Sequence, residues 1–395
     1  MTLPLSPTLA TAFAPPVMEA RAWLDQTTLK PELPLLNLSQ AAPVDPPTAP
    51  MREAMAEAVR QIPDIHLYGP VLGLPALREA LAAKWSAEYQ GSISPSEVAI
   101  TSGCNQAFCA AVTALAGPGD AIMLPLPWYF NHKMWLDMAG LETVTMPQGE
   151  DLLPDVEAAR ALITPKVKAI TLVSPNNPTG VEYPPHLLRA FAELCREHGI
   201  ALILDETYRD FHSLDGAPHD LFAQDWQDVL IHLYSFSKVY RLTGHRVGAL
   251  VANASLLAQV EKFLDTVAIC PGQVGQHAAL YGLRHMGEWV AGERLEILSR
   301  RAHLTQRLED LTNWTALGTG AYFCYLAHPF DAPSNQVARR LLEDQSILCL
   351  PGTMFGPTLA QGGDGRPERQ LRVAFANADA AGLDELIARL KAFVL

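Results

Sequence analysis

The sequence predicts an α/β protein of two domains: a large domain built on a mostly parallel sheet between helices, and a smaller α+β domain. Three observations support this prediction. The chain of 395 residues is longer than one ordinary hydrophobic core accommodates. Short apolar runs alternate with helical segments from about residue 98 to about residue 235, which is typical of parallel sheets covered by helices. Beyond about residue 282 the alternation stops.

The N-terminal part of the chain precedes the sheet. Its first thirty or so residues are rich in proline and are expected to form an arm with one short helix at 17–25. Longer helices are expected at 51–60 and 74–89. Pro75, near the start of the latter, is compatible with a helix, because the N–H that proline lacks has no partner in a first turn.

The large domain then alternates between strands and helices. We expect strands at 98–101, 121–124, 141–146, 169–173, 201–204 and 229–235, and helices at 105–115, 130–138 and 186–198. Ligands of parallel sheets bind at the carboxyl ends of the strands. Polar residues follow the strands at these ends, namely at 102–103, 174–177, 205 and 235–238. The sequence therefore places a ligand site along this edge of the sheet.

The C-terminal part is expected to form the smaller domain together with the N-terminal arm. A long helix rich in Arg and Leu is expected from about 282 to about 311, strands at 322–326 and 371–375, a loop at 361–367, and a last helix at 381–393. We assign residues 46–284 to the large domain, and residues 1–45 and 285–395 to the arm and small domain.

Composition excludes several classes of protein. Charged residues make up 18% and hydrophobic residues 49% of the chain, which indicates a globular protein rather than a disordered one. The net charge of −13 argues against nucleic acid and against anionic membrane surfaces as partners. No apolar run reaches the length of a membrane span, and residues 1–16 lack the pattern of a secretory signal.

The six cysteines are scattered and form no C-x-x-C pair. A chain of this length does not depend on disulfides for its stability. We therefore expect reduced cysteines and a cytoplasmic protein, and we predict no metal site.

Four motifs carry the chemistry, in this order along the chain: N-P-T-G at 177–180, D-E-T-Y at 205–208, S-F-S-K at 235–238, and Arg246. They supply an amide, a carboxylate, hydroxyls, an amine and a guanidinium. These are the groups that hold pyridoxal 5'-phosphate. The amine forms a Schiff base, the carboxylate pairs with the pyridine nitrogen, and the guanidinium and hydroxyls bind the phosphate.

With these motifs the chain resembles the class I/II aminotransferases, the fold-type-I group of pyridoxal-phosphate enzymes, from about residue 35 to about residue 372. The resemblance implies a large domain with a seven-stranded, mostly parallel sheet. It also implies a ping-pong reaction between an amino acid and a 2-oxo acid, and a homodimer with shared active sites. Lys238 would form the Schiff base and move the proton, and Asp205 would keep the ring nitrogen protonated. Tyr208 and Asn177 would bind the phenolate oxygen of the cofactor.

The resemblance also assigns residues to the cofactor phosphate. Ser235, Ser237 and Arg246 would bind it with their side chains. Backbone N–H groups at the start of a helix form a natural anion site, and Gly103, Cys104 and Asn105 would supply them here. Tyr68 resembles the tyrosine that reaches the phosphate bound by the neighbouring subunit.

The ring face and the substrate complete the implied site. Tyr129 is expected to stack on the pyridine ring, with Trp128 as the rival. Arg372 resembles the arginine that binds the substrate α-carboxylate as a bidentate fork, with Asn177 beside it. Ala41 stands where the family usually has glycine. The methyl group of alanine would narrow the substrate pocket. His245 stands where many relatives have tryptophan, either as a packing variation or as a group behind the site.

Two other functions stay open at this point. A C–S β-lyase uses the same cofactor and the same site residues for an elimination. A pyridoxal-phosphate-sensing transcription regulator fuses this domain to a DNA-binding segment, for which an acidic chain with a short N-terminal arm is poorly suited. The amino donor is not revealed, since no second arginine can be assigned to a side-chain carboxylate.

Overall fold

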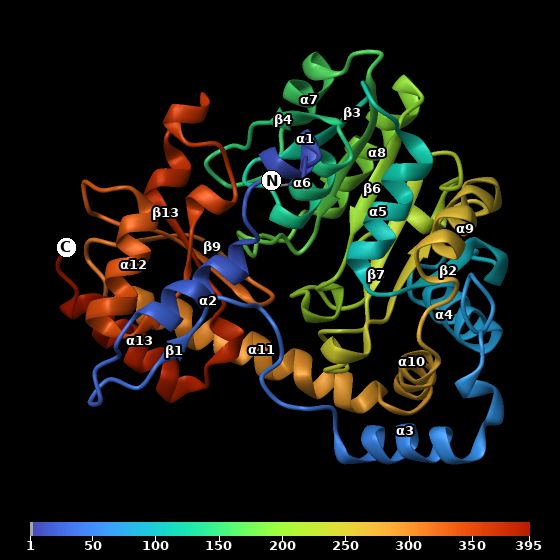
Figure 1. The fold of residues 1–395 in the computed structure, drawn as a ribbon, viewed down its shortest axis with the longest axis horizontal. Coiled ribbons are helices and arrows are strands. Elements are labelled where there is room, and N and C mark those ends of the chain that lie inside the picture. Colours follow the sequence, from blue (N-terminus) through green and yellow to red (C-terminus); the bar gives the residue numbers. More distant parts are fainter. Residues whose placement is uncertain (1–2) are drawn as a thin grey trace.

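A seven-stranded sheet forms the centre of the larger domain in the computed structural model, which describes residues 3–395 (Figure 1). Its order is β2-β8-β7-β6-β5-β3-β4. The strands are β2 Val98–Thr101, β3 Ala121–Pro125, β4 Glu142–Met146, β5 Val167–Val173, β6 Ala201–Asp205, β7 Leu230–Ser235 and β8 Gly248–Val251. Only β8 runs antiparallel to its neighbours within this sheet. The predicted mostly parallel sheet is therefore confirmed.

Helices cover both faces of this sheet, because successive strand residues point to opposite sides. In β3, for example, Ala121 and Met123 belong to one hydrophobic cluster, and Ile122 and Leu124 belong to the other. The first cluster includes α3, α4, α8 and α10, and the second includes α5, α6 and α9. The helices of this domain are α3 Ala49–Gln61, α4 Pro75–Glu88, α5 Cys104–Leu115, α6 Phe130–Met138, α7 Val156–Leu162, α8 Pro185–His198, α9 Ala254–Ala268 and α10 Gln273–His285.

The smaller domain has an antiparallel sheet of its own, in the order β12-β13-β10-β9. Its strands are β9 Thr315–Gly320, β10 Phe323–Ala327, β12 Leu350–Pro351 and β13 Gln370–Val373, and its helices are α11 Gly287–Leu308, α12 Ser334–Gln345 and α13 Ala380–Ala392. The helix α11 runs from beneath the large domain to the small one (Figure 1).

The N-terminal arm packs on the smaller domain. It contains α1 Pro7–Thr11, α2 Pro16–Gln26 and β1 Leu36–Asn37. β1 pairs in parallel with β11 Ile347–Leu348, and Trp23 and Leu38 are buried in the small-domain core. The residue boundaries that we assign to the two domains stay a prediction.

Some expected elements differ from those found. The single helix expected from about 282 to about 311 is wrong, because α10 ends at His285, α11 starts at Gly287, and Met286 between them has non-helical backbone angles. The strand expected at 371–375 ends at Val373, and a 3-10 turn follows at Phe375–Asn377. Several elements were not expected from the sequence, among them α7, α9, α12 and β8.

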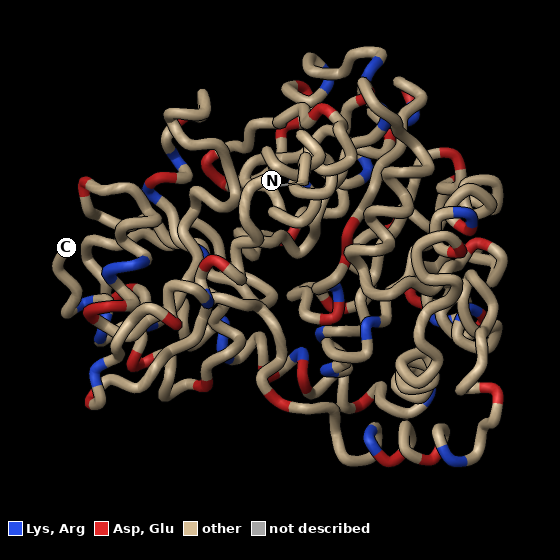
Figure 2. Tube along the Cα trace, viewed as in Figure 1, with Lys and Arg blue, Asp and Glu red and all other residues tan. Residues whose placement is uncertain are grey.

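Charge is spread evenly over the molecule. Figure 2 shows Lys and Arg interspersed with Asp and Glu over both domains. Within residues 3–395, no helix combines the length and the apolar character that crossing a membrane requires.

Candidate active site

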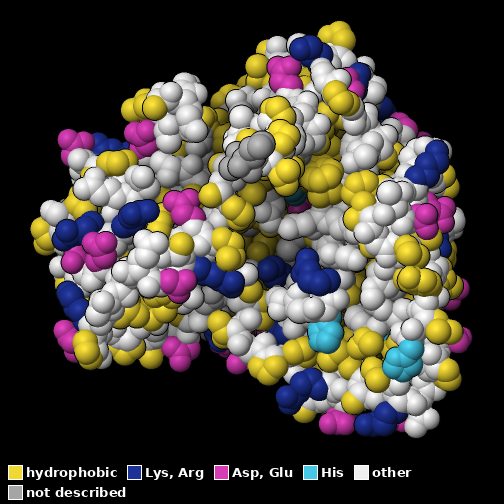
Figure 3. Space-filling model, viewed as in Figure 1, with side chains coloured by type: hydrophobic (Ala, Val, Ile, Leu, Met, Phe, Trp, Pro, Cys, Tyr) yellow, Lys and Arg dark blue, Asp and Glu magenta, His cyan; other side chains and the backbone are white. Residues whose placement is uncertain are grey.

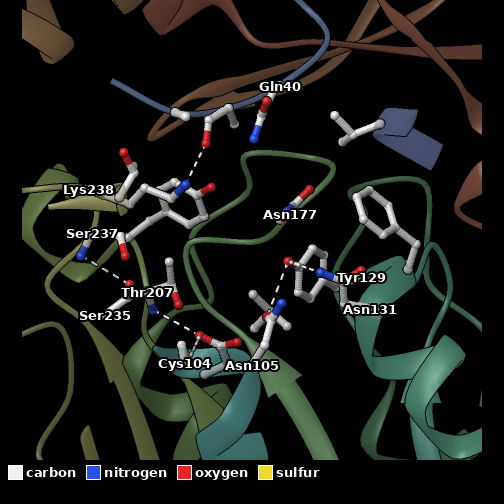
Figure 4. Close-up of a pocket in the computed structure, with 18 of the residues that line it drawn as sticks. Gln40, Cys104, Asn105, Tyr129, Asn131, Asn177, Thr207, Ser235, Ser237 and Lys238 are labelled. Carbon is white, nitrogen blue, oxygen red and sulfur yellow. Dashed lines mark hydrogen bonds between the residues drawn. The ribbon is translucent and has the colours of Figure 1, made fainter. Parts of the chain in front are cut away.

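A cavity of about 270 Å³ lies between the two domains at the carboxyl ends of the central strands. Figure 3 shows a hollow between the domains, with Lys or Arg side chains beside it, and Figure 4 shows the cavity wall in close-up. Most residues that the sequence assigned to the site line this cavity: Ala41, Cys104, Asn105, Tyr129, Asn177, Asp205, Tyr208, Ser235, Ser237, Lys238, Arg246 and Arg372. The fold thus brings together residues from both domains and the arm.

Lys238 follows strand β7 and points its amine into the cavity (Figure 4). Its Nζ donates a hydrogen bond to the backbone oxygen of Ala41 at 2.6 Å. Burial, and then the positive charges of Arg246 and Arg372, lower the pKa of Lys238 to about 8, although Asp205 acts in the opposite direction. Near neutral pH a much larger share of this amine is therefore uncharged than in an ordinary lysine.

Asp205 is the last residue of β6, and its side chain is only 3% exposed. Its Oδ1 accepts a hydrogen bond from the backbone N–H of Thr207 at 2.9 Å, and its Oδ2 lies 3.3 Å from Nε2 of His132. Burial by itself raises the pKa of Asp205, but the interactions with His132 and Thr207 outweigh burial and hold the pKa below its ordinary value. Asp205 is therefore a buried carboxylate that stays ionised.

His132, which was not assigned to the site from the sequence, contacts Asp205. It lies in the first turns of α6, three residues after Tyr129, and its ring stacks on Phe108 of α5 with 3.9 Å between ring centroids. This stacking fixes the direction of Nε2 toward Asp205. The spacing from Tyr129 was the only signal in the sequence, and it is not specific for such a contact.

Arg372, in β13, is 2% exposed, and no carboxylate of residues 3–395 pairs with it. One guanidinium nitrogen donates to Oδ1 of Asn177 at 2.9 Å and the other terminal nitrogen to the backbone oxygen of Ser39. Nε is buried without a hydrogen-bond acceptor. Burial lowers the pKa of Arg372 to about 10. A buried cation with only neutral partners is costly, and an anionic ligand would offset that cost.

Aromatic residues border the same space. Tyr208 is 4% exposed, and burial raises the pKa of its hydroxyl well above the ordinary value. The hydroxyl of Tyr129 accepts a hydrogen bond from Asn131 at 2.9 Å. Trp128 does not line this cavity but lines a second one with Lys133. The geometry thus favours Tyr129 over Trp128 for the ring contact, which stays a prediction.

The groups expected to bind the cofactor phosphate gather at the start of α5. Gly103 caps the helix with a φ of +89°, and a Cβ there would come within 2.3 Å of the Arg246 guanidinium. The positive φ favours glycine at this position, and a side chain there would displace the end of Arg246. Opposite, the backbone N–H of Ser237 donates to Oγ of Ser235 at 3.2 Å. The free N–H groups of the first helical turn add to the positive potential.

Besides Trp128, three residues singled out in the sequence do not line the cavity: Gly103, Tyr68 and His245. Gly103 lies directly behind it, against Arg246. Tyr68 is 79% exposed. Ala41 does line the cavity, and it is absent from the residues with positive φ, so its side chain introduces no backbone strain at this position.

A buried network next to the cavity fixes the segment that carries Asp205 and Tyr208. Glu206 is fully buried, accepts a hydrogen bond from the hydroxyl of Tyr89, and lies 2.7 Å from Nε2 of His232. Burial by itself raises the pKa of Glu206, but His219 and His232 hold it well below the ordinary value. An anchored Glu206 leaves little freedom to its neighbour Asp205.

Comparison with known proteins agrees with this geometry. The family model for aminotransferase class I and II matches residues 34–390. The aromatic aminotransferase ISS1 of Arabidopsis thaliana is 30% identical over 337 residues, which cover 82% of this chain and 84% of that protein. Transaminase BacF of Bacillus subtilis is 33% identical over 331 residues, which cover 82% of each chain.

Solved structures agree as well. The aspartate aminotransferase of Thermus thermophilus with maleate superposes with a TM-score of 0.88 at 26% sequence identity, covering 98% of this chain and 99% of that one. These relatives are named for different amino acids, aromatic in one case and aspartate in another.

Proposed function

Because this chain belongs to the class I and II aminotransferases, we propose that Lys238, Asp205 and Arg372 carry its reaction. The protein is a pyridoxal-phosphate-dependent transaminase that moves the amino group of an amino acid to a 2-oxo acid. The observation that carries the assignment of residues is that an amine of lowered pKa, an ionised buried carboxylate and an unneutralised buried guanidinium line one cavity.

The residues present fit the cofactor. Arg246, Ser235, Ser237 and the helix start at Cys104 form a cradle for a phosphate. Asp205 offers a carboxylate for a protonated ring nitrogen, and Asn177 and Tyr208 face the cavity as partners for a ring oxygen. Bound pyridoxal 5'-phosphate supplies an aldehyde carbon that takes up the donor's nitrogen and a ring that accepts electrons from the donor's Cα.

Lys238 is the amine that we assign to the covalent link with the cofactor. Once the donor takes its place, the freed Nζ would take up the proton from the donor's Cα, acting first as a base and then as an acid. A lysine with a pKa of about 8 can act as base and as acid near neutral pH, because both its neutral and its protonated form are populated there. Asp205 would hold a proton on the ring nitrogen, and His132 and Thr207 preserve the negative charge of Asp205.

Arg372 orients the donor. Its guanidinium binds the α-carboxylate, which offsets the buried positive charge and fixes Cα beside Lys238. Asn177 holds the guanidinium in place through the 2.9 Å contact of its Oδ1. This interaction requires a substrate with a carboxylate next to the amine.

We also propose a homodimer in which Tyr68 reaches the phosphate bound by the partner subunit. The support is that Tyr68 is 79% exposed, does not line the cavity of its own chain, and is accompanied by exposed Leu67, Val267 and Ile269. A cytoplasmic location is proposed from the six free cysteines, since such thiols persist in reducing compartments.

The half-reaction tests this function. Holoenzyme mixed with amino acids in the absence of an oxo acid should convert once to the pyridoxamine form, with one equivalent of 2-oxo acid released, and added oxo acid should reverse the absorbance change. A C–S β-lyase would instead release pyruvate and ammonia from cystathionine over many turnovers. Continuous turnover without an oxo acid, or no conversion by any amino acid, would contradict the proposal.

A further inference from the structure

The charged groups that line the cavity are few, and each has a role already. Among residues 3–395 the lining includes three cations, Lys238, Arg246 and Arg372, and one carboxylate, Asp205. The proposed function uses Lys238 for the covalent link, Arg246 for the phosphate, Arg372 for the α-carboxylate and Asp205 for the ring nitrogen. No charged lining residue is left for the side chain of the donor.

The rest of the wall is neutral. The part that comes from the arm and from the start of α6 includes Val17, Gln40, Ala42, Phe130 and Asn131. These side chains offer methyl groups, an aromatic ring and two amides. Amides and apolar groups accept a neutral side chain, but they do not neutralise a charged one.

Two further cations, Arg21 and Lys133, are held by other partners and do not line this cavity. Arg21 of α2 donates a hydrogen bond to Oε1 of Gln40 at 2.9 Å. The amide nitrogen of Gln40 is therefore the end that points toward the cavity (Figure 4). Lys133 of α6 pairs with Asp137 and lines the second cavity. Gln40 thus separates Arg21 from the substrate space.

The surface that the proposed dimer would add carries large hydrophobic side chains, with exposed Asp64 and Asp265 in the same segments. The segment of Tyr68 contacts the end of α9, because the backbone N–H of Gly69 donates to Sγ of Cys270 at 3.3 Å. The large side chains exposed there with Tyr68 are Leu67, Val267 and Ile269. A second copy that brings this patch to the cavity brings hydrophobic groups to it.

We propose that the enzyme takes amino donors with uncharged side chains and discriminates against acidic and basic ones; this inference rests on the proposed function. A carboxylate at the neutral wall gives up its hydration without gaining a cation. An ammonium or guanidinium there finds only Asp205, which the cofactor engages. Gln40 is the residue that sets this preference. It presents an amide to the substrate side chain, and without it the positive charge of Arg21 would face that side chain.

Isosteric pairs of donors provide the test. The wild-type holoenzyme is mixed separately with glutamine and glutamate, with asparagine and aspartate, and with leucine, phenylalanine, lysine and arginine. The second-order rate constant of the first half-reaction is measured for each donor from the change in cofactor absorbance. We expect the best donor to be uncharged, and each amide to react about tenfold or more faster than its acid. A charged amino acid as the best donor, or an acid equal to its amide, overturns the inference and leaves transamination intact. No reaction with any donor overturns the proposed function instead.

Two variants test the role of Gln40. Gln40→Ala removes the amide between Arg21 and the cavity, so the glutamate-to-glutamine ratio of rate constants should rise about tenfold. Arg21→Gln in the Gln40→Ala background should cancel the rise, and Arg21→Gln alone should leave the wild-type ratio unchanged. A ratio that does not respond to Gln40→Ala would overturn the placement of Gln40 beside the substrate side chain.

Discussion

Replacing Arg372 by lysine separates substrate recognition from the rest of the chemistry. Lysine keeps a positive charge in β13 but loses the fork that donates to Asn177 and Ser39 and would bind the α-carboxylate. Hydrogen bonds to charged groups contribute about 1.5–3 kcal/mol, so the rate constant for an amino acid should fall by roughly tenfold to over a hundredfold. A simple amine that lacks the carboxylate does not use the fork, and its rate constant should change by less than about threefold.

The assay compares an amino acid with its decarboxylated amine in the first half-reaction of the same holoenzyme. Arg389→Lys is the matched control, because Arg389 is also buried, at 4% exposed, and binds Glu385 and the backbone oxygens of Pro34 and Gln345 away from the cavity. That variant should lose stability and keep the ratio of the two rate constants. Equal losses for amino acid and amine in Arg372→Lys would refute the role given to Arg372.

Three further predictions concern the cofactor. Asp205→Asn should retain pyridoxal phosphate but lose about two orders of magnitude or more in single-turnover rate. His132→Phe keeps an aromatic ring against Phe108, and its single-turnover rate should fall by about tenfold to a hundredfold. A near-normal rate in Asp205→Asn would contradict the role given to Asp205. Mixing the inactive Lys238→Ala protein with a Tyr68→Phe protein should create hybrid dimers that each contain one intact site, so cofactor affinity should recover in the mixture; the absence of any recovery speaks against shared sites. The rate at which apoenzyme takes up cofactor should rise with pH around a midpoint of about 8, because burial lowers the pKa of Lys238 and the neutral amine is the nucleophile; a midpoint near that of an ordinary lysine would exclude this environment.

Much of the large domain was predictable because apolar strands and polar strand ends alternate in the sequence. Asp205 and Lys238 were assigned to one edge of the sheet, and both line the cavity. Strand β8 was missed because it is short and runs antiparallel between two other strands, so no crossover helix precedes it. The break at Met286 was missed because helical periodicity continues across it.

Long-range contacts were less predictable. His132 and Asp205 are in contact although they lie 73 positions apart in the chain (205 − 132). No local sequence pattern encodes such a contact. The same holds for Glu206, whose partners Tyr89 and His232 come from α4 and β7. The choice between Tyr129 and Trp128 depended on which of two adjacent aromatic residues faces the cavity, and the turn into α6 decides that. Tertiary packing determined each of these.

The most direct test of the central claim is to locate the lysine that binds the cofactor. Holoenzyme is reduced with borohydride, which makes the link between cofactor and lysine permanent, and the labelled peptide is identified by mass spectrometry. Lys238→Ala is treated in parallel, with its noncovalently bound cofactor measured before reduction. We expect the label to lie on Lys238 alone, and the variant to bind cofactor but gain no label; a label on another lysine of the wild-type protein would contradict the assignment of Lys238.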